Sequence, residues 1–147
     1  MLGEVDISNG SMNGFFSYQE LWTEIDMLMM LHPDILISKF SIGSTPKGRD
    51  INVIQIADIT GTPLDERGEI MITGGTHSRE LVSVSYCLFI IKTLVTEPTP
   101  EQKYLLKTRV IWLIPVLNVD GYSHISDYYL TNHHLLQVRK NLHGNYK

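Results

Sequence analysis

The sequence has a single cysteine, Cys87, among its 147 residues, and it has no long uninterrupted hydrophobic run. One cysteine excludes an internal disulfide framework and a cysteine-only metal cluster. The longest apolar stretch, residues 81–95, is broken by two serines and a lysine, so we expect no membrane span. Residues 1–13 carry acids and glycines where a signal peptide would have basic and apolar regions. The compartment of the protein therefore stays unknown.

Excess positive charge is also missing from this chain. The formal net charge is −4, from 12 Lys and Arg against 16 Asp and Glu. A protein that binds nucleic acid through phosphate contacts carries a basic surface, so we expect no nucleic-acid partner. The 43% hydrophobic and 19% charged content is typical of a folded globular chain. A length of 147 residues corresponds to at most one ordinary domain.

The first part of the chain predicts an arm, a helix and a hairpin. Residues 1–14 contain glycine and asparagine without any period, which predicts a flexible arm before a domain over residues 15–147. A capping-box pattern at 17–20 opens a helix that closes at a His-Pro pair. Residues 35–42 and 51–56 then predict two antiparallel strands around a turn rich in glycine and proline.

The second part predicts two more strands with helices between them. Residues 70–73 are short, β-branched and apolar, which predicts a buried strand, whereas 81–94 is long enough for a mostly buried helix. A shorter helix is expected to begin at the Thr-Pro pair 99–100. The apolar run 109–117 suits a central strand, and Pro115 within it marks a bulge or the end of the strand. We predict an α/β domain with a mixed sheet and helices on both faces. In this prediction residues 118–121 form a turn and the remaining tail has no clear period.

The stretch 74–80, Gly-Gly-Thr-His-Ser-Arg-Glu, stands between a predicted strand and a predicted helix. Glycines suit a sharp turn there because they adopt positive φ without strain. As the chain enters a helix, a spacing of three brings the side chains of His77 and Glu80 to one side. An imidazole and a carboxylate at the carboxyl end of a strand are suitable zinc donors. The same four-residue pattern also arises by chance, as a surface histidine beside a glutamate that favours the helix dipole.

The other histidine pairs are less suited to a metal site. His124 and Asp127 are three residues apart, and His133 and His134 are adjacent. Neither set has a third partner at a spacing that zinc sites use. We therefore expect these to be histidines without a metal.

Four segments, taken in order, resemble the metallocarboxypeptidases, the carboxypeptidase A-like zinc family. They are the first helix with its hairpin, the His-Ser-Arg-Glu motif, the Pro-Val-Leu-Asn-x-Asp-Gly-Tyr strand end at 115–122, and Arg-Lys-Asn at 139–141. The family usually has proline where Val119 stands and tryptophan where Leu81 stands. Leu142 replaces the last arginine of the family's Arg-Lys-Asn-Arg segment, so any contact of that arginine is lost.

The resemblance implies one Zn²⁺ ion, held by His77 and Glu80. It implies that Arg79 contacts the substrate and that Arg139 polarises the scissile carbonyl. The implied activity is hydrolysis of C-terminal residues from peptide and protein substrates, and family members are often secreted. The third zinc ligand and the glutamate general base lie further along the family's chain. We therefore expect residues 15–147 to form about the first half of a zinc carboxypeptidase domain, inactive alone.

Two alternatives from other classes stay open at this stage. The chain is either a non-catalytic peptide-binding or interaction module, or a fragment without a function of its own. Zinc content and a peptidase assay of the purified chain distinguish these alternatives from an enzyme.

Overall fold

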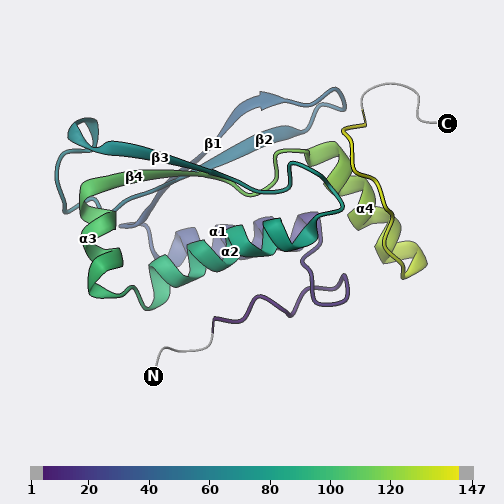
Figure 1. The fold of residues 1–147 in the computed structure, drawn as a ribbon, viewed down its shortest axis with the longest axis horizontal. Coiled ribbons are helices and arrows are strands. Elements are labelled where there is room, and N and C mark those ends of the chain that lie inside the picture. Colours follow the sequence, from purple (N-terminus) through teal and green to yellow (C-terminus); the bar gives the residue numbers. More distant parts are fainter. Residues whose placement is uncertain (1–4, 143–147) are drawn as a thin grey trace.

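Four strands form one mixed sheet in the order β1-β2-β4-β3, and helices pack against it (Figure 1). The computed structural model describes residues 5–142. The elements in chain order are α1 (Tyr18–Leu31), β1 (Leu36–Ser44), β2 (Asp50–Ile56), the 3-10 helix η1 (Leu64–Glu66), β3 (Gly68–Thr73), α2 (Leu81–Thr96), α3 (Pro100–Thr108), β4 (Arg109–Ile114) and α4 (Val119–Asn132).

The direction of the strands brings two strand ends to one edge of the sheet. β1 pairs antiparallel with β2, and β2 pairs antiparallel with β4. β3 and β4 pair in parallel, from Gly68 opposite Arg109 to Thr73 opposite Ile114, with α2 and α3 as the crossover between them. The predicted mixed α/β sheet and its parallel pair are confirmed. The loops that follow β3 and β4 consequently leave the sheet side by side, next to α4 (Figure 1).

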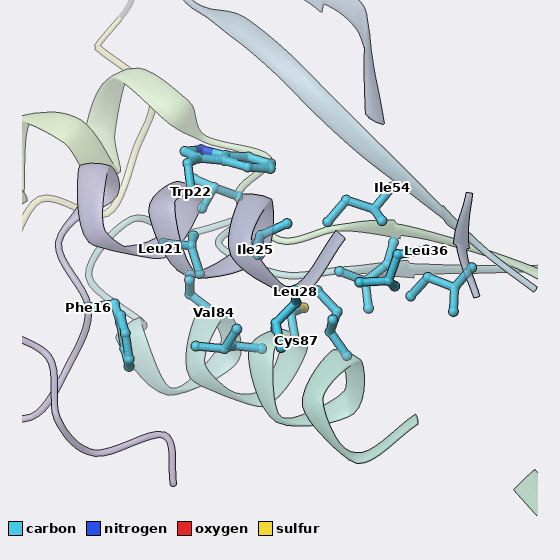
Figure 2. Close-up of a cluster of buried hydrophobic side chains, with 14 of the residues drawn as sticks. Phe16, Leu21, Trp22, Ile25, Leu28, Leu36, Ile54, Val84 and Cys87 are labelled. Atoms are coloured by element: carbon cyan, nitrogen blue, oxygen red, sulfur yellow. The ribbon is translucent and has the colours of Figure 1, made fainter. Parts of the chain in front are cut away.

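One face of the sheet forms the core with α1 and α2. Figure 2 shows side chains of α1, among them Leu21, Ile25 and Leu28, in one cluster with Val84 and Cys87 of α2. Leu36 and Ile54 extend that cluster from the sheet. The opposite face carries Trp112 and Phe40, whose rings meet edge to face at 6.0 Å. Neither α1 nor α2 covers this second face, and Phe40 and Met71 are exposed there within the described residues.

Two capping boxes fix the starts of α1 and α3, as the sequence predicts. Ser17 Oγ accepts from the backbone N–H of Glu20, whose carboxylate accepts from the backbone N–H of Ser17. Thr99 and Gln102 make the same reciprocal pair at α3, with Pro100 in the first turn. Each pair satisfies two backbone donors that a helix start would otherwise leave unpaired.

The helices are not suited individually to cross a membrane. Within residues 5–142, no single helix is both long and apolar enough to do so. One bent pair, α2 with α3, meets the length and composition only when the two are taken together, and they meet at 99°.

The described part of the predicted N-terminal arm packs on the helices. Gly10 and Gly14 pair across a short hairpin, and Met12 between them is 0% exposed within the core cluster. Lys92 of α2 donates to the carbonyl of Asp6 at 2.9 Å. These contacts give residues 6–14 a specific place on the domain.

Replacing Met12 with alanine is expected to lower the free energy of unfolding by about 2–4 kcal/mol, because the change removes a fully buried side chain and leaves a cavity. Urea unfolding followed by tryptophan fluorescence measures this loss. Met30→Ala is the matched control, since Met30 is 84% exposed and should change stability by less than about 0.5 kcal/mol. Equal stability of the two variants would show that the arm does not pack in solution.

The prediction of a turn at residues 118–121 and of an aperiodic tail is wrong over α4. Asn118 caps this helix by accepting from the backbone N–H of Gly121 at 3.1 Å. Val119, Tyr122 and Ile125 are buried at helical spacing on one side. The glycine marks close packing here, because a Cβ at position 121 would lie 2.6 Å from Ser78 Oγ. β4 does end at Ile114, next to Pro115, as predicted.

Candidate functional site

The junction between β3 and α2 is tied by its backbone to the chain that leaves β4. The N–H of Gly74 donates to the carbonyl of Ile114 at 2.8 Å. The carbonyl of Gly74 accepts from the N–H of Leu117 at 2.9 Å. The carbonyl of Gly75 accepts from Asn118 N at 2.9 Å. Gly75 has φ +56°, the positive value expected of a glycine at this turn. The two loops therefore act as one rigid support for residues 76–80.

His77 and Glu80 converge on this support, as the sequence predicts. His77 Nδ1 lies 2.9 Å from Glu80 Oε1, and the N–H of Glu80 donates to the carbonyl of His77 at 3.0 Å. Glu80 is the N-cap residue of α2, yet its side chain makes no capping hydrogen bond. Its carboxylate is thus turned towards the imidazole. The side chains of His77 and Glu80 are 35% and 52% exposed, so solutes reach both.

This pair fits part of a zinc site. With metal–ligand distances of about 2.0–2.2 Å and a tetrahedral angle, two donor atoms lie roughly 3.3 Å apart. The Nδ1–Oε1 separation of 2.9 Å is that of a hydrogen bond, so a shared ion would need the two atoms to move apart by a few tenths of an ångström. Within residues 5–142, no three His, Cys, Asp or Glu side chains are grouped to hold a metal ion. The described residues therefore offer a pair of donors and not a closed set.

A buried serine connects this motif to the segment that carries Arg139. Ser78 Oγ donates to the backbone carbonyl of Val138 at 2.6 Å, across 60 positions of sequence. Arg139, the next residue, is exposed. Arg79, the residue that follows Ser78 in the motif, is exposed as well. The side chain of Ser78 in the predicted metal motif thus holds the backbone of Val138, the residue before the predicted carbonyl-polarising arginine.

A second buried connection links the β1–β2 turn to the first turn of α4. The carboxylate of Asp120 is 4% exposed and lies 3.0 Å from Arg49 Nη1. The same carboxylate accepts from Thr45 Oγ1 at 2.9 Å and from Lys47 N at 3.3 Å. The hairpin turn is thereby fixed beside the loop that carries Asn118 and Val119.

The remaining candidate metal donors stay apart from His77 and Glu80. Burial raises the pKa of the Cys87 thiol to about 11, so this side chain stays a neutral thiol near neutral pH. His134 Nε2 lies 3.0 Å from the hydroxyl of Tyr128, and His133 is the C-cap residue of α4. His124 and Asp127 are exposed on α4.

Sequence reasoning missed Ser78 and Asp120 as parts of this site. Their partners are 60 and 75 positions away, so no local pattern points to them. One signal was present in the chain: Val119, Tyr122, Ile125 and Tyr129 recur at helical spacing. A helix there would have placed Asp120 in a first turn beside the motif.

The sequence has known relatives among carboxypeptidases. The model of a protein family described as "Zinc carboxypeptidase" matches residues 22–145 of this chain. A protein of Saccharothrix mutabilis subsp. capreolus named zinc carboxypeptidase is 33% identical over 122 residues, which is 82% of this chain and 27% of that protein. A protein of Paracoccidioides brasiliensis named inactive metallocarboxypeptidase ECM14 is 32% identical over 120 residues, 78% of this chain and 20% of that protein.

Solved structures share the fold. The crystal structure of thrombin activatable fibrinolysis inhibitor matches 98% of this chain with a TM-score of 0.75 at 23% identity. The match covers 34% of that structure, so the chain spans about a third or less of each of these three proteins. Because the family model covers most of the sequence, from the second turn of α1 past Arg139, this chain belongs to the zinc carboxypeptidase family.

Proposed function

We propose that this chain supplies two zinc ligands and the carbonyl-polarising arginine of a carboxypeptidase that removes C-terminal residues from peptides and proteins. His77 and Glu80 are the proposed ligands, Arg139 the polarising residue and Arg79 a substrate contact. Residues 1–147 are proposed to lack the remaining ligand and the general base, and so to have no peptidase activity of their own.

The observation that carries this proposal is the approach of His77 Nδ1 to Glu80 Oε1 at 2.9 Å, at the carboxyl end of β3. Open sheets place ligands outside the carboxyl ends of their strands, which is where this pair lies. The attachment of residue 138 to the same motif supports a second group at that edge.

Each proposed residue has a separate task. Bound zinc supplies a Lewis acid and lowers the pKa of its water. Glu80 is proposed to act as a ligand and not as the base, and its carboxylate lies 2.9 Å from the imidazole of the other proposed ligand. Arg139 offers a fixed positive charge where an oxyanion develops, and such a charge stabilises the transition state more than the ground state. Arg79, which follows the buried Ser78 in the chain, offers a guanidinium to the carbonyl groups or carboxylate of a peptide.

Zinc titration of residues 1–147 tests the metal pair. Closed four-ligand zinc sites contribute about 10–16 kcal/mol near neutral pH, so two ligands should give roughly half. The expected dissociation constant lies between about a millimolar and a micromolar. Glu80→Ala and His77→Ala should each weaken binding by about tenfold or more in isothermal titration calorimetry.

Glu69→Ala and His124→Ala are the matched controls for this titration, since both side chains are exposed and lie on other elements. Binding that is unaffected by both His77→Ala and Glu80→Ala would refute the ligand pair. Turnover of a blocked dipeptide by residues 1–147, abolished by a chelator, would refute the proposed need for further residues.

A second candidate function is a non-catalytic module that binds peptide C-termini. It is favoured by the absence of a three-donor group within residues 5–142 and by a relative that is named an inactive metallocarboxypeptidase. Exposed Arg79 and Arg139 suit a carboxylate. Binding of a free-carboxylate peptide without zinc, together with loss of binding when the same peptide is amidated, would favour this module over the metal site.

A further inference from the structure

Ser78 is fully buried between two residues that are not. His77 is half-buried and Arg79 is exposed, so the chain turns the serine side chain inward while its neighbours face outward. A serine hydroxyl carries one donor proton. Here the hydroxyl donates to the carbonyl of Val138 at 2.6 Å.

The space around Ser78 admits little movement. A Cβ placed on Gly121 would lie 2.6 Å from Ser78 Oγ and 2.7 Å from Ser78 Cβ, so the first turn of α4 closes directly over the serine. This contact needs a glycine on the helix and a small side chain on the motif. Ser78 therefore joins the metal motif, α4 and residue 138 at one point.

The segment that receives this hydrogen bond has few other fixed points. Residues 133–142 contain no helix or strand. The side chains of Val138, Leu135 and Leu136 pack partly buried against the core, whereas Arg139 and Lys140 are exposed. Consecutive Cα atoms are about 3.8 Å apart, so a fixed carbonyl at 138 also limits where the Arg139 backbone lies.

We infer that Ser78 is a positioning residue: its hydroxyl holds the Val138 carbonyl and so keeps Arg139 at the edge where His77 and Glu80 converge. The inference rests on the proposed function for the role of Arg139. Ser78 stands between the proposed ligand His77 and the proposed substrate contact Arg79. Its role is to orient Arg139, and it does not contact the substrate itself. Misplacing a charged group by about 1 Å costs on the order of a hundredfold in rate, so such a tether bears on catalysis.

Limited trypsin digestion of residues 1–147 tests the tether without any need for activity. Trypsin cleaves after Arg139 and Lys140 once this segment opens, and mass spectrometry of the released C-terminal peptide gives the rate. Loss of one hydrogen bond in Ser78→Ala should raise the open population, and with it the rate of cleavage at these sites, roughly 2- to 12-fold. Cleavage at Lys103 in the same digest reports global unfolding and should rise less.

Ser126→Ala is the matched control for this digestion. Ser126 is also buried, and its hydroxyl accepts from the backbone N–H of Tyr18 at 3.0 Å, so the variant removes one buried serine hydrogen bond elsewhere. Cleavage after Arg139 should stay at the wild-type rate. Equal rates at Arg139 in Ser78→Ala, Ser126→Ala and wild type would overturn the inference.

A paramagnetic probe separates orientation from general support. Mn²⁺ bound by His77 and Glu80 should broaden the Nε–H resonance of Arg139 in wild type, and this broadening should fall at least twofold in Ser78→Ala while that of the Arg79 amide is unchanged. Unchanged broadening at Arg139 would overturn the inference. If Mn²⁺ broadens no resonance near His77, the proposed metal pair fails and the digestion alone decides the tether.

If Ser78→Ala does not fold, the backbone mobility of Arg139 in the wild-type protein tests the tether instead. A tethered Arg139 amide should show a heteronuclear ¹⁵N NOE close to that of amides in α4. A value near that of a freely moving chain would overturn the inference.

Discussion

Replacing Gly74 with alanine is expected to lower the free energy of unfolding by about 3 kcal/mol or more, enough to unfold a marginal domain. The added Cβ would lie 2.7 Å from the carbonyl oxygen of Pro115 and 2.8 Å from that of Ser83. It would also lie 2.7 Å from Cys87 Sγ. Two of these three atoms belong to backbone and have no rotamer by which to move aside.

Relief of the Gly74→Ala clash requires the junction after β3 to separate from the end of β4. That movement breaks the hydrogen bonds of Gly74 with Ile114 and Leu117 and displaces His77 with the loop. Urea unfolding measures the effect. Gly68→Ala at the other end of β3 is the control, because its Cβ would meet only the Arg109 side chain at 3.4 Å and 3.5 Å. Stability of Gly74→Ala within about 1 kcal/mol of Gly68→Ala would refute the packing described for the junction.

Asp120→Ala is expected to cost about 2–4 kcal/mol of stability. The carboxylate is buried and accepts from the Thr45 hydroxyl, the Lys47 N–H and the Arg49 guanidinium, and alanine leaves all three without this acceptor. Breaking a buried ion pair from one side costs about 3–5 kcal/mol. The side chain of Arg49 is 36% exposed and so regains water, which reduces the expected loss.

Two further variants serve as controls for Asp120→Ala. Asp127→Ala removes an exposed carboxylate from the same helix and should change stability by less than about 0.5 kcal/mol. Asp120→Asn keeps the shape and one acceptor oxygen and should fall between the other two. The same urea unfolding series tests all three. A loss as small for Asp120→Ala as for Asp127→Ala would show that the hairpin turn is not fixed to α4.

The predictable parts of this fold are those marked by local runs of apolar residues, although not all of them are buried. The strand at 70–73, predicted to be buried, belongs to β3, which lies at the edge of the sheet with most of its residues exposed. The strands at 35–42, 51–56 and 70–73 and the long helix after Glu80 follow from runs of aliphatic residues. The helical period of α4 is a weaker signal, because its apolar residues share the inward side of the helix with polar ones. Asp120, Ser123 and Ser126 are buried there. The partners of Asp120 and Ser126 lie in the hairpin turn and at the start of α1, so the hydrophobic period of α4 is interrupted by groups that only the tertiary structure pairs.

In the candidate site too, the residues placed by local contacts could be predicted and those placed by long-range contacts could not. His77 and Glu80 are three residues apart just before a helix, and the turn closed by the hydrogen bond from Glu80 N–H to the carbonyl of His77 brings their side chains to one side. The position of Arg139 depends on a hydrogen bond across 60 residues and on the fit of Gly121 over Ser78, and neither has a local signature. The roles of His77, Glu80, Arg79 and Arg139 stay predictions until zinc binding and turnover are measured.

The strand order delays completion of the sheet during synthesis on the ribosome. Of the four strands described, β4 is translated last, yet it occupies the place between β2 and β3. Translation from the end of β3 to the end of β4 takes roughly 2–8 s at about 5–20 residues per second. Throughout that interval both earlier strands present open hydrogen-bonding edges, which neighbouring nascent chains are able to join. The yield of native protein should therefore depend on elongation speed across the α2–α3 crossover and on chaperones that shield it.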